Sequence, residues 1–281
     1  INNGDGDVSS FITNPSFELG NLTGWSIVTG AWGATARTNS DVWATTDTDG
    51  TYLLDCYTAD GTYSWATPVT QTLTGLTNGL YELKALVTSF GPGEGGIPAD
   101  SIGNTVYLIG NSYHKGFIAD TKTQFKEATL YFLVEDGTAK IGVVGGQHGY
   151  YYPKRGCFFK ADNFRLKYIC DAPHGRVKLA LDEANAATLD KYGQAALDLS
   201  AYEAAYANKT ITGDGSAEVA AIYAALQAAA KAQKTAGADM TYAITNPNFE
   251  TGTIEGWTCA TGGDTKAAPQ ENSTYTSGCV Y

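Results

Sequence analysis

The sequence is poor in the residue types on which many catalytic and metal sites depend. Its 281 residues include three histidines, one methionine and five cysteines. It contains no CxxC pair and no HExxH motif, so a zinc site is not expected. No apolar run reaches the roughly 20 residues that a membrane-spanning helix needs. Membrane insertion is therefore not expected either.

Positive charge is also scarce. The chain has 18 Lys and Arg against 29 Asp and Glu, which gives a formal net charge of −11 and an isoelectric point near 4.6. Such a surface repels both the phosphate backbone of nucleic acids and anionic lipid headgroups. We therefore do not expect a nucleic-acid or membrane partner.

Glycine and aromatic residues are abundant instead. There are 33 glycines, and aromatic residues make up 12% of the chain. Runs rich in β-branched and aromatic residues, separated by Gly, Asn, Asp or Pro, predict seven or eight strands of a β-sandwich. These runs are 51–56, 69–73, 81–90, 105–109, 125–133, 140–144 and 158–169.

One segment of the chain occurs twice. Ile12–Trp25 (ITNPSFELGNLTGW) recurs as Ile244–Trp257 (ITNPNFETGTIEGW), starting 232 residues later (244 − 12), and nine of the fourteen positions are identical. A repeat of this quality indicates that the same kind of module begins twice. We expect residues 243–281 to be the start of a second, incomplete copy of the first module.

Between the two copies the composition becomes helical. From 173 to 240 the chain is rich in Ala, with Leu and Tyr at helical spacing. The pattern predicts helices near 175–187, 190–207 and 216–235 that form a small three-helix bundle. The expected organisation is therefore mainly β: a sandwich in 1–170, a helical spacer in 173–240 and a truncated second sandwich in 243–281.

The repeated motif resembles a known family. Asn14-Pro-Ser-Phe-Glu18, followed by Gly24-Trp25, is similar to the opening of the jelly-roll carbohydrate-binding modules that accompany xylanases and laminarinases. The segment Phe158–Leu166 resembles the last strand of those modules, so the resemblance covers residues 12 to about 170. The helical segment more weakly resembles the FIVAR modules of surface glycosidases and adhesins, on helix spacing alone.

The resemblance implies a structural calcium ion. Glu18 and Asp162 match the carboxylates that hold calcium in such modules, and the loop Asp47–Gly50, with Asp49, is expected to supply further oxygen ligands. The alternative is that Glu18 is a solvated residue at a strand end and Asp162 a bulge residue.

Sugar-binding residues are expected in the loops, because loops on a rigid sandwich carry function. Aromatic rings stack on the C–H faces of sugars, while tyrosine hydroxyls bond to sugar hydroxyls. Phe17 and Trp25 belong to the folding signature and are expected in the core. The candidates for ligand contact are Trp32, Trp43, Trp65, Tyr150 and Tyr152. For each of them, packing beneath a loop is the alternative.

The cysteines suggest one cross-link. In jelly rolls of the resembled type, the strand ending at Cys56 runs antiparallel beside the last strand, which starts near Cys157. This arrangement makes Cys56 and Cys157 the candidate disulfide, and such a bond would favour an exported protein.

Three functions are consistent with the sequence. The first is a non-catalytic module that binds polysaccharides or glycoprotein glycans as part of a larger secreted or cell-surface protein. The second is a structural or adhesin-type repeat that assembles with further copies of itself. The third, less favoured, is a glycan-active enzyme, which would need two carboxylates facing each other across a cleft.

Overall fold

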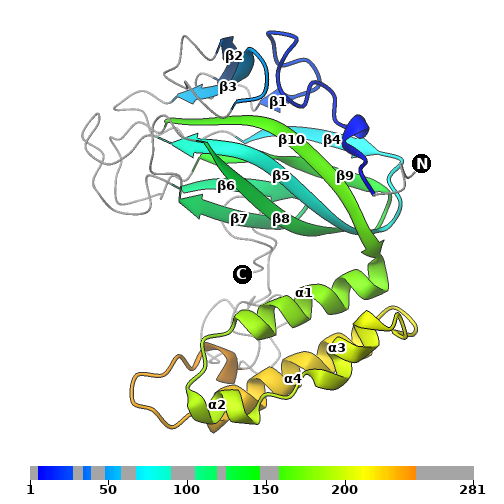
Figure 1. Cartoon of the computed structure of the whole chain (residues 1–281), viewed down its shortest axis with the longest axis vertical. Coiled ribbons are helices and arrows are strands. Elements are labelled where there is room, and N and C mark those ends of the chain that lie inside the picture. Colours follow the sequence, from blue (N-terminus) through cyan, green and yellow to red (C-terminus); the bar gives the residue numbers. More distant parts are fainter. Residues whose placement is uncertain are drawn as a thin grey trace, which may run out of the picture. The chain divides into compact units, whose positions relative to one another are not determined.

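The computed structural model describes residues 6–27, 34–38, 48–57, 68–89, 105–118, 125–145 and 158–244. Its internal contacts divide the chain into two compact units, Ile1–Ile169 and Cys170–Tyr281. The first unit is built of strands and the second of helices (Figure 1). Among the described residues, no helix is both long and apolar enough to span a membrane.

The first unit is a sandwich of two antiparallel five-stranded sheets, which confirms the predicted fold class. The strands of one sheet, in spatial order, are β1 (Ser26–Ile27), β4 (Val69–Thr74), β9 (Thr138–Gly145), β6 (Thr105–Gly110) and β7 (Tyr113–Ile118). Those of the other sheet are β2 (Ala34–Thr38), β3 (Tyr52–Tyr57), β10 (Phe158–Asp171), β5 (Gly79–Ser89) and β8 (Lys126–Val134).

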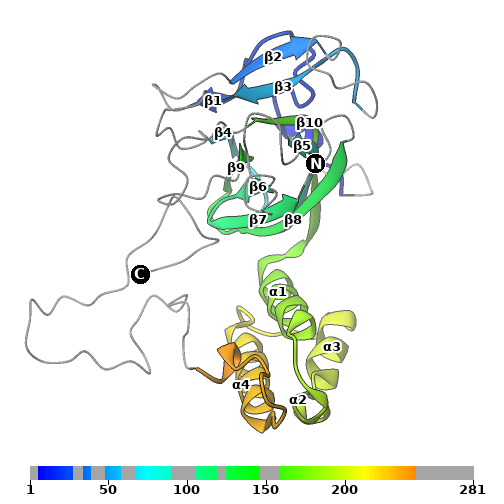
Figure 2. The ribbon, with the colours of Figure 1, turned by 90° about the vertical axis from the view of Figure 1, so that its left-hand side faces the viewer.

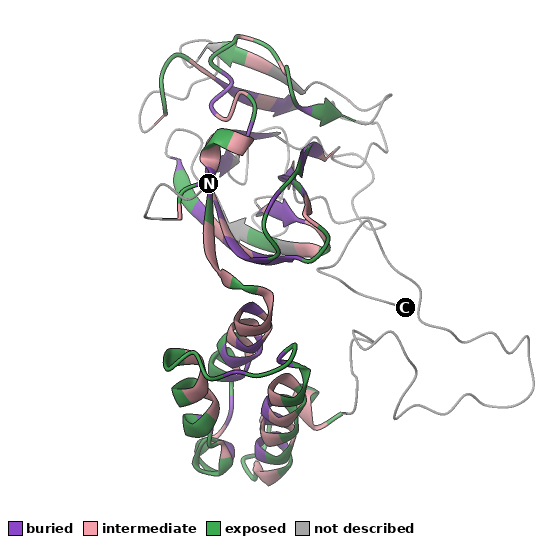
Figure 3. Cartoon of the chain, turned by 90° about the vertical axis from the view of Figure 1, so that its right-hand side faces the viewer, coloured by how far each residue is buried: buried purple, intermediate pink, exposed green. Residues whose placement is uncertain are grey.

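The core lies between the two sheets. Inward-facing positions alternate with outward-facing ones, as in β8, where Ala128, Leu130 and Phe132 are buried. Figure 3 shows buried residues along the strands of the sandwich. All seven predicted runs form strands of the sandwich. The sequence reading missed β1, β2 and β7, because these short edge strands carry no strong apolar pattern.

The two ends of the sandwich are connected differently. At one end, short turns link β4 to β5 (75–78), β6 to β7 (111–112) and β8 to β9 (135–137), and the longer segment 39–51 links β2 to β3. Gly75, Asn111 and Gly137 have positive φ in these turns, at 78°, 54° and 75°. At the other end, the longer segments 28–33, 58–68, 90–104, 119–125 and 146–157 each join a strand of one sheet to a strand of the other.

The second unit contains helices α1 (Ala172–Ala186), α2 (Lys191–Ala196), α3 (Ser200–Ala207) and α4 (Ser216–Ala232). They share an apolar core that includes Val177, Ile222 and Leu226, and Figure 2 shows α1 beside α3 and α4. A 3-10 turn, η3 (Thr241–Ala243), follows.

The segment 190–207 contains two helices, α2 and α3, where the periodicity predicted one. The chain leaves the helical conformation at Leu197, and the Asp198 carboxylate then accepts hydrogen bonds from Ser200 N at 3.0 Å and from Ser200 Oγ at 2.7 Å. An aspartate in this position favours a new helix start over continuation of the previous helix. Helical periodicity alone does not detect such a break.

Candidate functional site

The opening motif folds into a compact turn around Asn14. The Asn14 side-chain oxygen accepts from Leu19 N at 3.1 Å, and its amide nitrogen donates to Asn21 O at 2.8 Å. The carbonyl of Asn14 accepts from the indole nitrogen of Trp25 at 3.0 Å. The first asparagine of the motif therefore fixes both the turn and the orientation of its tryptophan.

Three aromatic rings connect this motif to the last strand. Phe17 and Trp25 lie 5.3 Å apart between ring centroids, and Trp25 lies 4.7 Å from Phe164 of β10. Phe17 and Phe164 are in edge-to-face contact at 6.2 Å. All three rings are buried, so the expectation that Phe17 and Trp25 belong to the core is confirmed. Phe164 N also donates to Pro15 O at 3.0 Å.

The Glu18 carboxylate caps the start of β3. It accepts from Thr51 N at 2.9 Å and from Tyr52 N at 2.8 Å. Gly50 makes this approach possible, because a Cβ at residue 50 would lie 2.5 Å from the carboxyl carbon of Glu18. The sequence reading placed Gly50 in the expected loop but missed this role. The positive φ of 78° that Gly50 adopts has no sequence signal beyond the preceding Asp-Thr-Asp.

Asp162 is fully buried where β10 passes the motif. Its Oδ2 accepts from Asp49 N at 2.7 Å and its Oδ1 from Asn163 N at 2.7 Å. Burial, reinforced by the nearby negative charges of Asp49 and Glu18, raises the pKa of Asp162 to about 7, although the two hydrogen bonds act in the opposite direction. The three predicted metal-binding residues are thus near enough to interact.

The chemistry of these carboxylates suits a hard cation. Each offers oxygen atoms that calcium prefers, and the hydrogen bonds above leave further lone pairs available. In the described part of the chain, however, no three His, Cys, Asp or Glu side chains are gathered tightly enough to hold a metal ion. Calcium binding therefore stays a prediction, and it requires additional oxygen ligands.

All five predicted sugar-contacting residues, Trp32, Trp43, Trp65, Tyr150 and Tyr152, lie outside the described residues. The strand register nevertheless fixes where their segments start and end. In one sheet, Ile27 is opposite Val69, and Val69 is opposite Val143. At one end of that sheet, measured along the strand direction, β1 and β9 therefore finish and β4 starts.

In the second sheet, too, several strands start or finish at one common end. Ala34 of β2 is opposite Cys56 of β3, and Tyr57 is opposite Phe158 of β10. Three segments connect this end of the second sheet to the same end of the first: 28–33, 58–68 and 146–157. These strand ends lie at the same side of the sandwich in Figure 1. Four of the five predicted residues belong to these segments. Trp43 is the exception, because its segment joins β2 to β3 at the opposite end.

The predicted disulfide falls partly outside the described residues, because Cys157 is not among them. The strand arrangement that motivated it is confirmed, since β3 and β10 pair antiparallel with Cys56 opposite Phe159. The bond between Cys56 and Cys157 stays a prediction.

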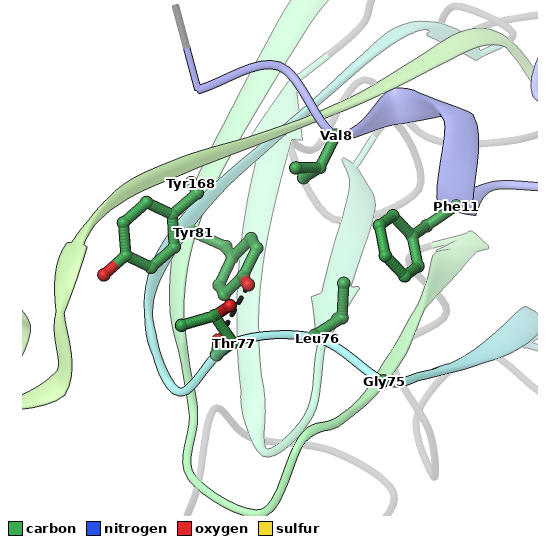
Figure 4. Close-up of a pocket in the computed structure, with 7 residues that line it drawn as sticks. All are labelled: Val8, Phe11, Gly75, Leu76, Thr77, Tyr81 and Tyr168. Atoms are coloured by element: carbon green, nitrogen blue, oxygen red, sulfur yellow. Dashed lines mark hydrogen bonds between the residues drawn. The ribbon is translucent and has the colours of Figure 1, made fainter. Parts of the chain in front are cut away.

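A small cavity of about 190 Å³ opens near the first turn of the chain (Figure 4). Its wall is mixed: Val8, Phe11 and Leu76 contribute apolar groups, and Thr77, Tyr81 and Tyr168 contribute hydroxyl-bearing side chains. The Tyr81 hydroxyl donates to Thr77 O at 2.7 Å. None of the residues predicted to contact sugar lines this cavity.

No family model matches the chain, and no curated protein matches it. Among solved structures, the chain is similar to the carbohydrate-binding module TmCBM61 in complex with β-1,4-galactotriose, with 17% identity, a TM-score of 0.39, and coverage of 57% of this chain and 98% of that one. It is also similar to a family 35 carbohydrate-binding module from Clostridium thermocellum (11% identity, TM-score 0.33, 53% and 95% coverage).

A third similar structure is the CBM22-1–GH10 portion of the Clostridium thermocellum xylanase 10B complexed with xylohexaose, with 14% identity and a TM-score of 0.37. It covers 66% of this chain, while the chain spans only 31% of that structure. All three TM-scores are below 0.5, so the functional argument that follows depends on the chain's own residues.

Proposed function

We propose that the sandwich unit is a non-catalytic carbohydrate-binding module of a larger secreted or cell-surface protein. The observation that carries the proposal is the strand register. It brings the ends of the segments containing Trp32, Trp65, Tyr150 and Tyr152 to one side of the sandwich, whereas Glu18 of the repeated motif caps the start of β3 at the opposite end. Folding residues and candidate ligand residues are thereby separated.

The chemistry of these residues fits a polysaccharide or a glycoprotein glycan. Flat aromatic rings contact the C–H faces of sugars, and tyrosine hydroxyls exchange hydrogen bonds with sugar hydroxyls. The net charge of −11 favours neutral over acidic glycans. Binding by a few rings of this kind is expected to be moderate in strength, because each contact also immobilises a side chain.

Affinity electrophoresis against plant, host and microbial polysaccharides tests the proposal. The intact chain should be retarded by at least one of them, and replacing Trp32, Trp65 or Tyr152 with Ala should reduce that retardation. Tyr192→Ala is a matched control, because this tyrosine is exposed and belongs to the helical unit, not to the sandwich. Absence of retardation in every gel, or equal retardation of all variants, would refute sugar binding at this end.

We also propose that Glu18, Asp49 and Asp162 hold a structural calcium ion together with backbone oxygens. The support is the repulsion of the fully buried Asp162 by the carboxylates of Asp49 and Glu18, which a divalent cation would relieve. An ion that binds only the folded state stabilises it by mass action. Chelation should therefore lower the melting temperature of the sandwich and added calcium should restore it. Glu18→Gln should abolish the difference in melting temperature between chelator and calcium. Glu82→Gln should not, because this carboxylate of β5 is bonded to Tyr131 and does not belong to the predicted site.

A further inference from the structure

The chain contains two turns of the same construction at the repeat offset of 232 residues. η1 (Ser9–Phe11) and η3 (Thr241–Ala243) are both single 3-10 turns. Each leads into an extended isoleucine, with φ −85° and ψ 120° at Ile12, and φ −80° and ψ 134° at Ile244. The two turns are thus equivalent in backbone conformation as well as in position.

An aspartate caps both turns in the same way. Asp7 Oδ1 accepts from Ser9 N at 2.8 Å, and Asp239 Oδ1 accepts from Thr241 N at 2.9 Å. The structural repeat therefore begins at Asp7 and Asp239, five residues before the identity that the sequence shows. We call Asp7–Ile12 and Asp239–Ile244 the first and second entry turns.

The last strand of the sandwich covers the first entry turn. Val8 N donates to Leu166 O of β10 at 2.9 Å, and Leu166 N donates to Ser9 Oγ at 3.0 Å. Val8 is only 6% exposed, and Ile12, at 4%, lies in the same core cluster of the sandwich, with the adjacent Thr13 bonded to Gln71 of β4. In the first copy, therefore, the entry turn and β10 form one packed, hydrogen-bonded unit.

The second entry turn is covered on one side only. Tyr242 and Ala243 pack against the core of the helical unit, and the Gln233 amide donates to Asp239 O. Met240 and Ile244, which correspond to Val8 and Ile12, are 44% and 48% exposed. They are two of the few large apolar side chains that are exposed in the described part of the chain.

We infer that the exposed side of the second entry turn is a docking surface for the last strand of a second sandwich. The required partner is a strand of the β10 type, which offers a backbone N–H and C=O pair, as Leu166 does, and apolar side chains against Met240 and Ile244. Phe249 and Glu250 repeat Phe17 and Glu18, so the sequence after the turn carries the same anchoring residues for that strand. The helical unit then serves as a connector that holds the start of the next sandwich in place.

The test compares the 281-residue chain with the same chain extended by a copy of residues 50–171. Tyr281 corresponds to Asp49 at the repeat offset, so the extension completes the second copy with residues that fold in the first. Hydrogen exchange is measured at the amides of 239–244. We expect the Met240 amide to exchange about tenfold more slowly, or slower still, in the extended chain, because it gains the hydrogen bond that Val8 makes.

Four substitutions separate docking from a merely local effect. Met240→Asp and Ile244→Asp should leave melting of the 281-residue chain unchanged but should abolish the slow exchange in the extended chain. Val8→Asp and Ile12→Asp, the equivalent changes, should lower the melting temperature of the first sandwich in both chains.

Several results would overturn the inference. Unchanged exchange in the extended chain is one, and an extension that stays unfolded by circular dichroism is another, because the same residues fold in the first copy. The inference would also be refuted if the Met240 amide exchanged equally slowly when the copied strand carries the substitution equivalent to Leu166→Asp. Slow, concentration-dependent exchange in the 281-residue chain itself would show that a second copy of this chain covers the turn instead.

Discussion

Asp162 should make the stability of the sandwich depend on pH in an unusual direction. Its pKa of about 7 in the folded chain lies well above the ordinary value of 3.8. Between these two values the folded state binds more protons than the unfolded state. The free energy of unfolding therefore increases as the pH falls through this window and is lowest above pH 7.

The size of the effect follows from the pKa difference. About three pKa units, at roughly 1.4 kcal/mol each, correspond to about 4 kcal/mol over the whole window. Between pH 8 and pH 5 the expected gain is about 3 kcal/mol. Carboxylates with a lowered pKa, such as Glu127 beside Arg165, oppose this gain only below about pH 5. Asp55, whose pKa burial raises, acts in the same direction as Asp162.

The assay is urea unfolding at pH 5 and pH 8 in chelator, followed by tryptophan fluorescence, since four of the five tryptophans precede residue 170. Asp162→Asn should remove most of the pH dependence, and Glu18→Gln should reduce it by removing one repelling charge. Saturating calcium should also reduce the difference in the free energy of unfolding between pH 5 and pH 8 if the ion binds the charged carboxylates. A wild-type chain that is equally stable at both pH values, or an Asp162→Asn variant with an unchanged pH dependence, would refute this reasoning.

Three further predictions concern the framework of the two units. Phe17→Ala should lower the free energy of unfolding of the sandwich by roughly 3–5 kcal/mol, because it removes a fully buried ring from the motif cluster, and urea titration checks this. Gly50→Ala should cost more stability than Gly75→Ala in the same titration, because both glycines have φ 78° but only a Cβ at 50 would collide with Glu18. Asp190→Ala should lower the melting temperature of the helical unit in circular dichroism and leave the sandwich transition in place, because this carboxylate accepts from Tyr192 N, Gly193 N, Lys234 N and Thr235 N.

The residue patterns predict the sandwich, whereas the grouping of Glu18, Asp49 and Asp162 was expected only from the family resemblance. Long alternating runs such as those of β5 and β8 carry a strong period-two signal, and the repeated motif marked its own anchoring residues. The pairing of β3 with β10 was also predicted, although from the resemblance and not from the residues themselves.

Other features depend on tertiary contacts that local patterns do not encode. The entry turns share only Asp and Ile among their six positions, so their equivalence becomes visible in hydrogen bonds and φ and ψ angles. An aspartate two residues before Ser or Thr, repeated at the same offset, was the one available signal. The pKa of Asp162 likewise depends on burial and on two carboxylates that are distant in the sequence.

The connections at the two ends of the sandwich differ in how well they tolerate insertions and deletions. Lengthening a long connection costs little, since each doubling of a loop adds only about 0.6 kcal/mol of closure entropy. The tight turns at 75–78, 111–112 and 135–137 fix their positive-φ residues and allow no such change. The segment 39–51 lies at the same end and is longer, but Asp162 and Glu18 hold its last residues, Asp49 and Thr51. Insertions and deletions should therefore accumulate at 28–33, 58–68, 90–104, 119–125 and 146–157. That end of the sandwich is the place at which new specificities could be grafted without altering the scaffold.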